Sequence, residues 1–123
     1  MNVPANLLYT ATHEWVKIDG NLATLGITDH AQSELGDIVY VDLPNVGRAL
    51  QAKESFGSIE SVKTVSDSYV PFACEVVETN GALGAQPELI NNAPYTDGWI
   101  LKVKFDGNTE GLLDADAYSA TIG

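Results

Sequence analysis

Cysteine is almost absent from this chain of 123 residues, in which Cys74 is the only one. A single cysteine cannot form an internal disulfide, and the sequence is therefore compatible with a reducing compartment. A chain of this length is the size of one domain and can bury a modest core without disulfides or a metal. We expect one domain that spans residues 1–123.

Long apolar runs and targeting signals are also missing. No apolar run approaches the roughly 18 residues that a membrane span needs. The N-terminal stretch MNVPANLLYT contains neither a basic segment followed by a long apolar one nor an Arg-rich amphipathic pattern. The sequence predicts a cytoplasmic protein of bacterial type, with no transit peptide and no contact with a membrane.

Positive charge is scarce, because 6 basic residues stand against 17 acidic ones and give a formal charge of −11. Such a chain repels nucleic acid and anionic membranes, so binding to either is not expected. Its partners should offer basic surfaces, although acidity also simply keeps small proteins soluble. Between Lys53 and Lys102 the only basic residue is Lys63.

The equipment of an independent catalyst is absent too. There are only two histidines, His13 and His30, and no G-x-S-x-G sequence, so a hydroxyl nucleophile with its base is not indicated. Zinc-ligand spacing, a P-loop, G-x-G-x-x-G and an EF-hand pattern are all missing. A dyad of Cys74 with a histidine is an alternative, but a lone cysteine in a strand beside Val76 is typical of a small buried hydrophobe. The sequence predicts a protein that is not an enzyme.

The patterns that are present indicate short β-strands with small helices between them. HEWVKI and NLATLGI flank an Asp-Gly turn and predict a hairpin. TDHAQSELG predicts a short helix near 28–35, with Thr28 or Asp29 as its N-cap and Gly36 as its stop.

Further along, DIVYVDL, ALQAKESFGSIE, WILKVKF and the two halves of VSDSYVPFACEVVETN read as extended chain. In WILKVKF, alternation places Trp99 on one face with Leu101, Val103 and Phe105. TEGLLDADAYSAT predicts a C-terminal helix near 109–119. We expect an all-β fold with small helices at its margins.

Lys63 lies in the segment SVKT between two such strands, and therefore at the tip of a hairpin. Turns usually carry Gly, Asn or Pro. A type I turn tolerates Val62 and Lys63, but exposing Val62 and Val65 contributes nothing to folding, which predicts that something else contacts this tip. One interpretation is that an enzyme acylates Lys63; the other is that Lys63 is a solvated lysine on an ordinary loop.

The segment ESVKTVSD, residues 60–67, resembles the lipoylation site of the H protein of the glycine cleavage system. YTATHEWV, GITDHAQSELGDIVYVDLP, PELINNAPYTDGW and LLDADAYSA resemble the same family in order and spacing. A biotin carrier would show methionines beside its lysine, where this chain has Val62 and Thr64. The resemblance implies a flattened β barrel-sandwich hybrid, as in lipoyl domains, with the lysine at a hairpin turn.

The resemblance also implies a carrier role. Lipoate would be attached covalently as N6-lipoyl-lysine at Lys63 by a lipoylating enzyme. The arm would receive an aminomethyl group from a pyridoxal-phosphate glycine decarboxylase and pass it to a tetrahydrofolate-dependent aminomethyltransferase, and a dihydrolipoyl dehydrogenase would reoxidise it. Each partner's cofactor does the chemistry, while tethering contributes effective concentration. The carrier is expected to be a monomer.

By motif position, the resemblance assigns further site residues. Glu60 matches the acid that lipoylating enzymes favour in this family. Thr12, Glu14 and Asp67 match a cleft for the loaded arm, whose ammonium suits carboxylate and hydroxyl acceptors. The alternative is that these are ordinary solvated side chains. His13 has no evident chemical role and is predicted to be structural.

A departure from the family pattern and a second functional hypothesis follow from the same motifs. The segment PFACEV carries Cys74 where the family usually has glycine, which predicts altered packing opposite the lysine tip. A second functional hypothesis is a lipoate relay, which would donate lipoyl groups to 2-oxo acid dehydrogenases. The presence of Thr12, Glu14 and Asp67 favours the glycine-cleavage carrier, because a relay has no ammonium to hold.

Overall fold

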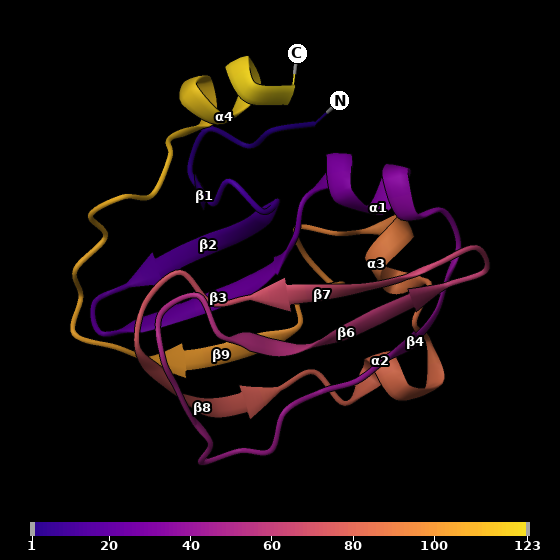
Figure 1. The fold of residues 1–123 in the computed structure, drawn as a ribbon, viewed down its shortest axis with the longest axis horizontal. Helices are drawn as coiled ribbons and strands as arrows, with labels where there is room; N and C mark the ends of the chain where they lie inside the picture. Colours follow the sequence, from indigo (N-terminus) through magenta and orange to yellow (C-terminus); the bar gives the residue numbers. More distant parts are fainter. Residues whose placement is uncertain (1, 123) are drawn as a thin grey trace.

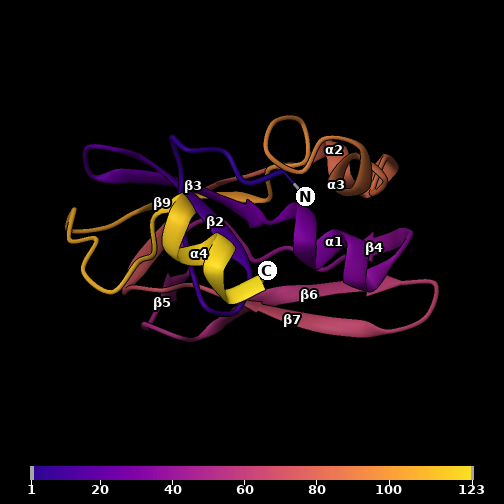
Figure 2. The same cartoon turned by 90° about the horizontal axis from the view of Figure 1, so that it is seen from above.

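A computed structural model describes residues 2–122, which form two β-sheets that face one another (Figures 1 and 2). The larger sheet has six strands in the order β1-β2-β3-β9-β8-β5, and the smaller has three in the order β4-β6-β7. The strands of the larger sheet are β1 (Leu8–Tyr9), β2 (Glu14–Asp19), β3 (Leu22–Ile27), β5 (Ala49–Leu50), β8 (Cys74–Thr79) and β9 (Leu101–Lys104). Those of the smaller sheet are β4 (Ile38–Val41), β6 (Ser55–Ser61) and β7 (Val65–Tyr69). This flattened sandwich confirms the predicted fold class.

Four short helices lie at the margins of the sandwich (Figure 1): α1 (Asp29–Leu35), α2 (Ala82–Ala85), α3 (Leu89–Asn92) and α4 (Ala115–Ile122). Helix α1 agrees with its prediction, because the Thr28 hydroxyl accepts a bond from the Ala31 amide and Gly36, at φ 82°, ends it. Helices α2 and α3 were not predicted, since single turns carry no measurable hydrophobic period. Within residues 2–122, no helix combines the length and the apolar character needed to cross a bilayer.

The C-terminal helix begins later than predicted, at Ala115 rather than near residue 109. Gly111 has φ 89°, which a continuing helix does not accommodate. Leu113 instead pairs with Tyr9 through two backbone hydrogen bonds of 2.8 Å. The Asp114 carboxylate then accepts a 2.8 Å bond from the Ala117 amide and caps the start of α4.

The main core lies between the sheets and buries side chains such as Leu25, Ile59, Leu101 and Val103. Burial of side chains of this size contributes about 1.5–3 kcal/mol each. A second cluster forms on the other face of the larger sheet around Tyr9, Trp15 and Tyr118.

Trp15 shows how closely that second cluster packs. A Cβ on its strand partner Gly26 would lie 2.6 Å from the Trp15 indole nitrogen, so only glycine leaves room for the ring. Trp99 also packs against this cluster, and the Lys102 ammonium lies 5.0 Å from its ring centroid. The prediction that Trp99 shares a face with Leu101 is therefore wrong, because Trp99 precedes β9 and does not continue its alternation.

Candidate functional site

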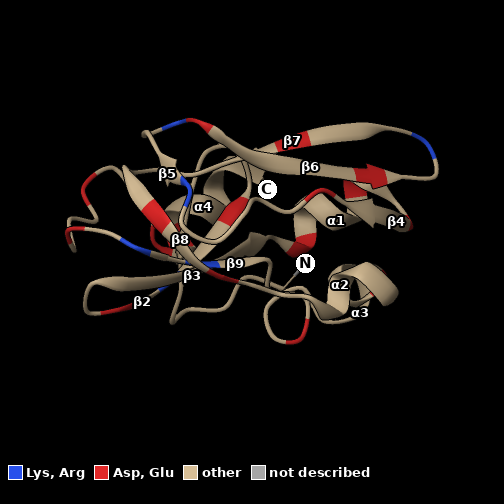
Figure 3. Ribbon diagram, turned by 90° about the horizontal axis from the view of Figure 1, so that it is seen from below, with Lys and Arg blue, Asp and Glu red and all other residues tan. Residues whose placement is uncertain are grey.

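Lys63 is exposed in the turn that joins β6 to β7, as predicted. In Figure 3, a basic segment marks this turn at one end of the molecule, and acidic segments lie on the strands behind it. No carboxylate among residues 2–122 forms an ion pair with Lys63. The amine is therefore presented to solvent.

Ser61 holds the backbone of this turn from inside the hairpin, a role that the sequence analysis missed. Its side chain is 5% exposed, and Oγ accepts hydrogen bonds from the Lys63 amide at 3.3 Å and the Thr64 amide at 3.1 Å. The Ser61 amide donates a 2.8 Å bond to the Thr64 carbonyl. A buried serine that bonds its own turn allows Lys63 to occupy a tip that normally needs Gly or Asn.

An apolar row with one acid at its centre lies beside the turn. The strand register places Tyr40 of β4 opposite Glu60 of β6, and Glu60 opposite Val65 of β7. Tyr40 is 57% exposed, Val65 59% and the neighbouring Val62 70%. Exposure of several large apolar side chains around one residue is typical of surfaces that contact a partner.

Glu14 carries an almost fully buried carboxylate, 1% exposed. Its Oε1 accepts bonds from the hydroxyls of Thr10 at 2.6 Å and Thr12 at 2.5 Å, and Oε2 accepts one from the Tyr69 amide at 3.4 Å. No basic group among residues 2–122 lies within ion-pair distance of it. Burial raises the pKa of Glu14, and these hydrogen bonds oppose that rise.

The chain before β2 folds tightly to bring both threonines to this carboxylate. The Thr10 amide bonds the Glu14 carbonyl at 3.0 Å, and the Glu14 amide bonds Thr10 Oγ1 at 3.1 Å. His13 adopts the left-handed conformation at φ 73° to complete the turn. Thr10 was not predicted, although the spacing Thr10-x-Thr12-x-Glu14 was a usable signal.

Two open grooves meet at Thr12. The first, which we call the α1–β7 groove, has a volume of about 350 Å³ and runs between α1 and β7. It is lined by Thr12, His13, Ile27, His30, Ala31, Glu34, Leu35, Ser66, Asp67 and Ser68. The second, the β2–β7 groove, has a volume of about 740 Å³ and is lined by Glu14 with Thr10, Thr12, Tyr69 and the 110–112 loop among others.

The α1–β7 groove begins close to Lys63. Leu35 lines it, and the adjacent Gly36 lies beneath the lysine stem, whose Cε is 3.6 Å from the place that a Cβ on Gly36 would occupy. The groove reaches Thr12, which bonds Glu14. The groove therefore reaches from Leu35, the sequence neighbour of the glycine beneath the Lys63 stem, to the hydroxyl that bonds the buried carboxylate.

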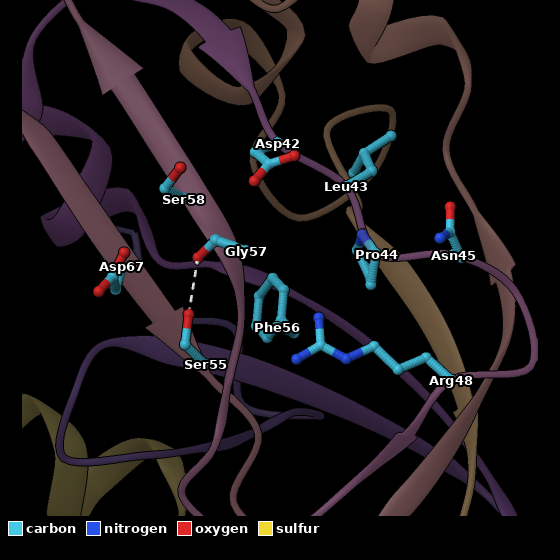
Figure 4. A pocket seen from close by; sticks show the side chains of 10 residues that line it. All are labelled: Asp42, Leu43, Pro44, Asn45, Arg48, Ser55, Phe56, Gly57, Ser58 and Asp67. Carbon is cyan, nitrogen blue, oxygen red and sulfur yellow. Dashed lines mark hydrogen bonds between the residues drawn. The ribbon is translucent and has the colours of Figure 1, made fainter.

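Asp67 lies at the boundary between this groove and a hollow on the outer face of the smaller sheet. Register places Asp67 opposite Ser58, and both line the hollow, which has a volume of about 350 Å³, with Asp42 and Arg48 (Figure 4). Within the described chain, no hydrogen bond joins Asp67 to Thr12 or Glu14. The structure therefore brings Thr12 and Glu14 together. Asp67 lies in the wall of the α1–β7 groove, which Thr12 also lines but Glu14 does not.

His13 and Cys74 take structural positions. The His13 Nδ1 is 2.8 Å from the Tyr118 hydroxyl, which is 2.7 Å from Thr28 Oγ1, so this network ties α4 to the start of α1. Burial and the neighbouring His30 lower the pKa of His13. Cys74 is half-buried at the start of β8, opposite Leu50. The expectation that it faces the lysine tip is wrong, because β8 starts at the opposite end of the molecule from that turn (Figures 1 and 2).

Comparison with known proteins covers almost the whole chain. A sequence model of the glycine cleavage H-protein family matches residues 7–123. Glycine cleavage system H proteins of Bacteroides thetaiotaomicron and Symbiobacterium thermophilum are 53% and 54% identical, over 99% and 97% of this chain and 98% and 94% of theirs. The crystal structure of a glycine cleavage system H protein from Mycobacterium marinum superposes with a TM-score of 0.92 at 39% identity, covering 98% of this chain and 99% of that one. The chain therefore belongs to the glycine cleavage H-protein family.

Proposed function

We propose that this protein is the lipoyl-lysine carrier of a glycine cleavage system, with Lys63 as the attachment residue. The names of its relatives support a role in the glycine cleavage system. The exposed turn at Lys63 supports that residue as the attachment point. Lipoate in amide linkage supplies a dithiolane that carries the aminomethyl group and two electrons. The chain itself contributes presentation and shelter, and the partners' cofactors do the covalent chemistry.

The lysine turn fits such an attachment. The Lys63 amine is free of ion pairs in the described chain, while Ser61 fixes the backbone on both sides of the tip. A long arm on a firm turn keeps its end at high local concentration near the protein and still lets it enter a partner. Amide formation also removes one positive charge from an already acidic protein.

The buried carboxylate of Glu14 is the observation that best supports a resting site for the loaded arm. A buried carboxylate with hydroxyl and amide donors but no cation is an unusually costly arrangement. An ammonium brought along the α1–β7 groove to Thr12 would supply the missing positive charge and form charge-assisted hydrogen bonds. Asp67, in the wall of the same groove, would add negative charge along the path. Thr12 would orient Glu14 and contribute its own oxygen.

Glu60 and its apolar neighbours support recognition by the enzymes that act on the arm. An acid flanked by Tyr40 and Val65 offers a partner both burial and one specific charge pair. We assign this row first to the lipoylating enzyme. The glycine decarboxylase, the aminomethyltransferase and dihydrolipoyl dehydrogenase must each also approach the same end of the protein, because Lys63 is there. A monomeric carrier leaves that end open to all four.

A reconstitution experiment tests the proposal. Lipoylated wild-type protein, mixed with glycine decarboxylase and glycine, should support glycine-dependent release of carbon dioxide, and Lys63→Arg protein treated in the same way should not. A lipoate relay gives a different result: lipoyl transfer to the acyltransferase of a 2-oxo acid dehydrogenase without any carbon dioxide from glycine. That second result would replace the carrier with the relay.

A further inference from the structure

We propose that Asn91 is a positioning residue for Lys63, acting through the segment Gly36–Asp37–Ile38 that supports the lysine turn from below. The inference rests on the proposed function, because the turn matters only if Lys63 is the modified residue. Asn91 lies in the segment PELINNAPY, residues 87–95, which contributes no residue to the lysine turn or to the grooves around Thr12.

The lysine turn touches the segment 36–38 in two places. The stem of Lys63 packs over Gly36, with Cε 3.6 Å from the place of a Cβ on that residue. The Val62 amide donates a 3.0 Å hydrogen bond to the Asp37 carbonyl. Val62 precedes Lys63 directly, so the position of Asp37 helps to set the position of the tip.

Asn91 holds this segment on both sides of Asp37. Its Oδ1 accepts a 2.9 Å bond from the Ile38 amide, and its Nδ2 donates bonds of 2.9 Å to the Gly36 carbonyl and to Gln32 Oε1. Both donors of the amide and one lone pair of its oxygen are therefore used. An aspartate or a leucine of similar size could not make this set of contacts.

Asn91 is itself held in place by the core. It belongs to α3, whose Ile90 is fully buried in the main cluster. The amide of Ala93, which follows the last residue of the helix, closes its single turn with a 2.8 Å bond to the Leu89 carbonyl. A segment far along the chain thus fixes the base on which the lysine turn rests, while Ser61 fixes the turn from within.

Loss of the Asn91 side chain should release the base without removing any group that a partner touches. The turn would then spend less time in the presented geometry. A partner that binds only this geometry meets a smaller competent fraction, so its apparent KM rises while kcat at saturation is unchanged. A merely destabilised fold would not give this split at temperatures where the protein stays folded.

Asn80 offers a matched control within the same chain. It also donates two side-chain bonds, to the Asp97 carbonyl at 2.9 Å and the Trp99 carbonyl at 2.8 Å, and accepts one from the Ala82 amide at 3.2 Å. None of these partners touches the lysine turn. Asn80→Ala and Asn91→Ala thus remove equal numbers of hydrogen bonds from different places.

The first measurement is amide hydrogen exchange on the unmodified protein, which needs no lipoate. In Asn91→Ala the Val62 amide should exchange about tenfold faster than in wild type, because its acceptor is no longer held. In Asn80→Ala it should exchange at the wild-type rate. An unchanged Val62 rate in Asn91→Ala, or equal acceleration in both variants, would overturn the proposal.

The second measurement is the kinetics of attachment by a lipoylating enzyme supplied with lipoate and ATP. Asn91→Ala should raise the KM for the protein about tenfold with kcat unchanged, and Asn80→Ala should leave both constants at the wild-type values. Equal KM values for the two variants would contradict the positioning role. If Asn91→Ala does not fold, Asn91→Asp replaces it, because aspartate keeps the acceptor for Ile38 and removes only the donated bonds.

A parallel experiment with the Lys63→Arg variant separates this inference from the proposed function. Continued lipoylation of Lys63→Arg protein would show that the attachment residue is wrong, and the kinetic comparison would then lose its meaning. The exchange comparison at Val62 would still decide whether Asn91 holds the turn.

Discussion

The hydroxyl of Thr12 donates a 2.5 Å hydrogen bond to Oε1 of Glu14, whose side chain is 1% exposed. Thr12 itself is exposed and lines both grooves. The pair thus joins an accessible hydroxyl to a buried acid. A cationic ligand bound at Thr12 would lie close enough to Glu14 to be attracted by its negative charge, although Glu14 itself is shielded from solvent.

The burial of Glu14 should be visible in the pH dependence of stability. The pKa of Glu14 is raised in the folded protein. As pH rises, the Glu14 carboxyl therefore loses its proton at a lower pH in the unfolded chain than in the folded protein. The free energy of unfolding of wild type should therefore fall relative to Glu14→Gln as pH is raised from about 4 to 7. Urea unfolding of both proteins across this range, with the exposed Glu75→Gln as control, measures the difference. A difference independent of pH would contradict the burial argument.

Removal of the acids should also shorten the life of the loaded arm. If its ammonium rests at Thr12 beside Glu14, and Asp67 in the groove wall adds negative charge nearby, Glu14→Gln should speed spontaneous ammonia loss by about tenfold, since charge-assisted hydrogen bonds contribute about 1.5–3 kcal/mol. Asp67→Asn should speed it by a smaller factor. Lipoylation of Lys63 should remain normal in both variants. Ammonia release without any transferase is the readout, and Glu75→Gln should behave as wild type. Equal rates in all four proteins would remove the roles assigned to Glu14, Asp67 and Thr12.

Glu60 should matter for recognition but not for folding. It is exposed between Tyr40 and Val65, so Glu60→Gln should change the free energy of unfolding by less than about 0.5 kcal/mol. The KM of the lipoylating enzyme for the Glu60→Gln protein should rise several-fold, because a basic group on the enzyme would lose the carboxylate that it pairs with. Steady-state lipoylation of Glu60→Gln against Glu75→Gln tests this. Identical KM values would leave Glu60 without a role.

Cys74 should be nearly inert in the native protein. Burial, with the nearby Glu54 charge, raises its pKa to about 11, so at pH 7 only about one thiol in 10,000 is ionised. Labelling by an aromatic disulfide reagent should be slow until urea unfolds the chain. Rapid labelling of the native protein would contradict the burial and the raised pKa of Cys74.

Local rules in the sequence were enough for much of the fold. The β2–β3 hairpin follows from an Asp-Gly turn between alternating strands, and α1 follows from Thr28 and Gly36 at its two ends. Lys63 was correctly placed at a hairpin tip. Each of these features is decided by residues within a few positions of one another.

The supports of the site depend on contacts between distant segments, which periodicity does not reveal. Thr28 and His13 meet through Tyr118 of α4, and Asn91 bonds residues more than 50 positions away. The start of α4 was misplaced because Leu113 pairs with Tyr9 instead of entering the helix. Glu14 could be named from its motif, but its burial and its lack of a basic partner follow only from the folded chain.

We propose that Lys63 carries the lipoyl group, and peptide mass spectrometry of protein isolated from its native host tests this most directly. The exposed amine, free of ion pairs on a turn fixed by Ser61, predicts one lipoyl group per chain, located on the peptide that contains Lys63. Lys53 and Lys102 serve as internal controls and should be unmodified. A lipoyl group found on either of them while Lys63 remains free would contradict the account.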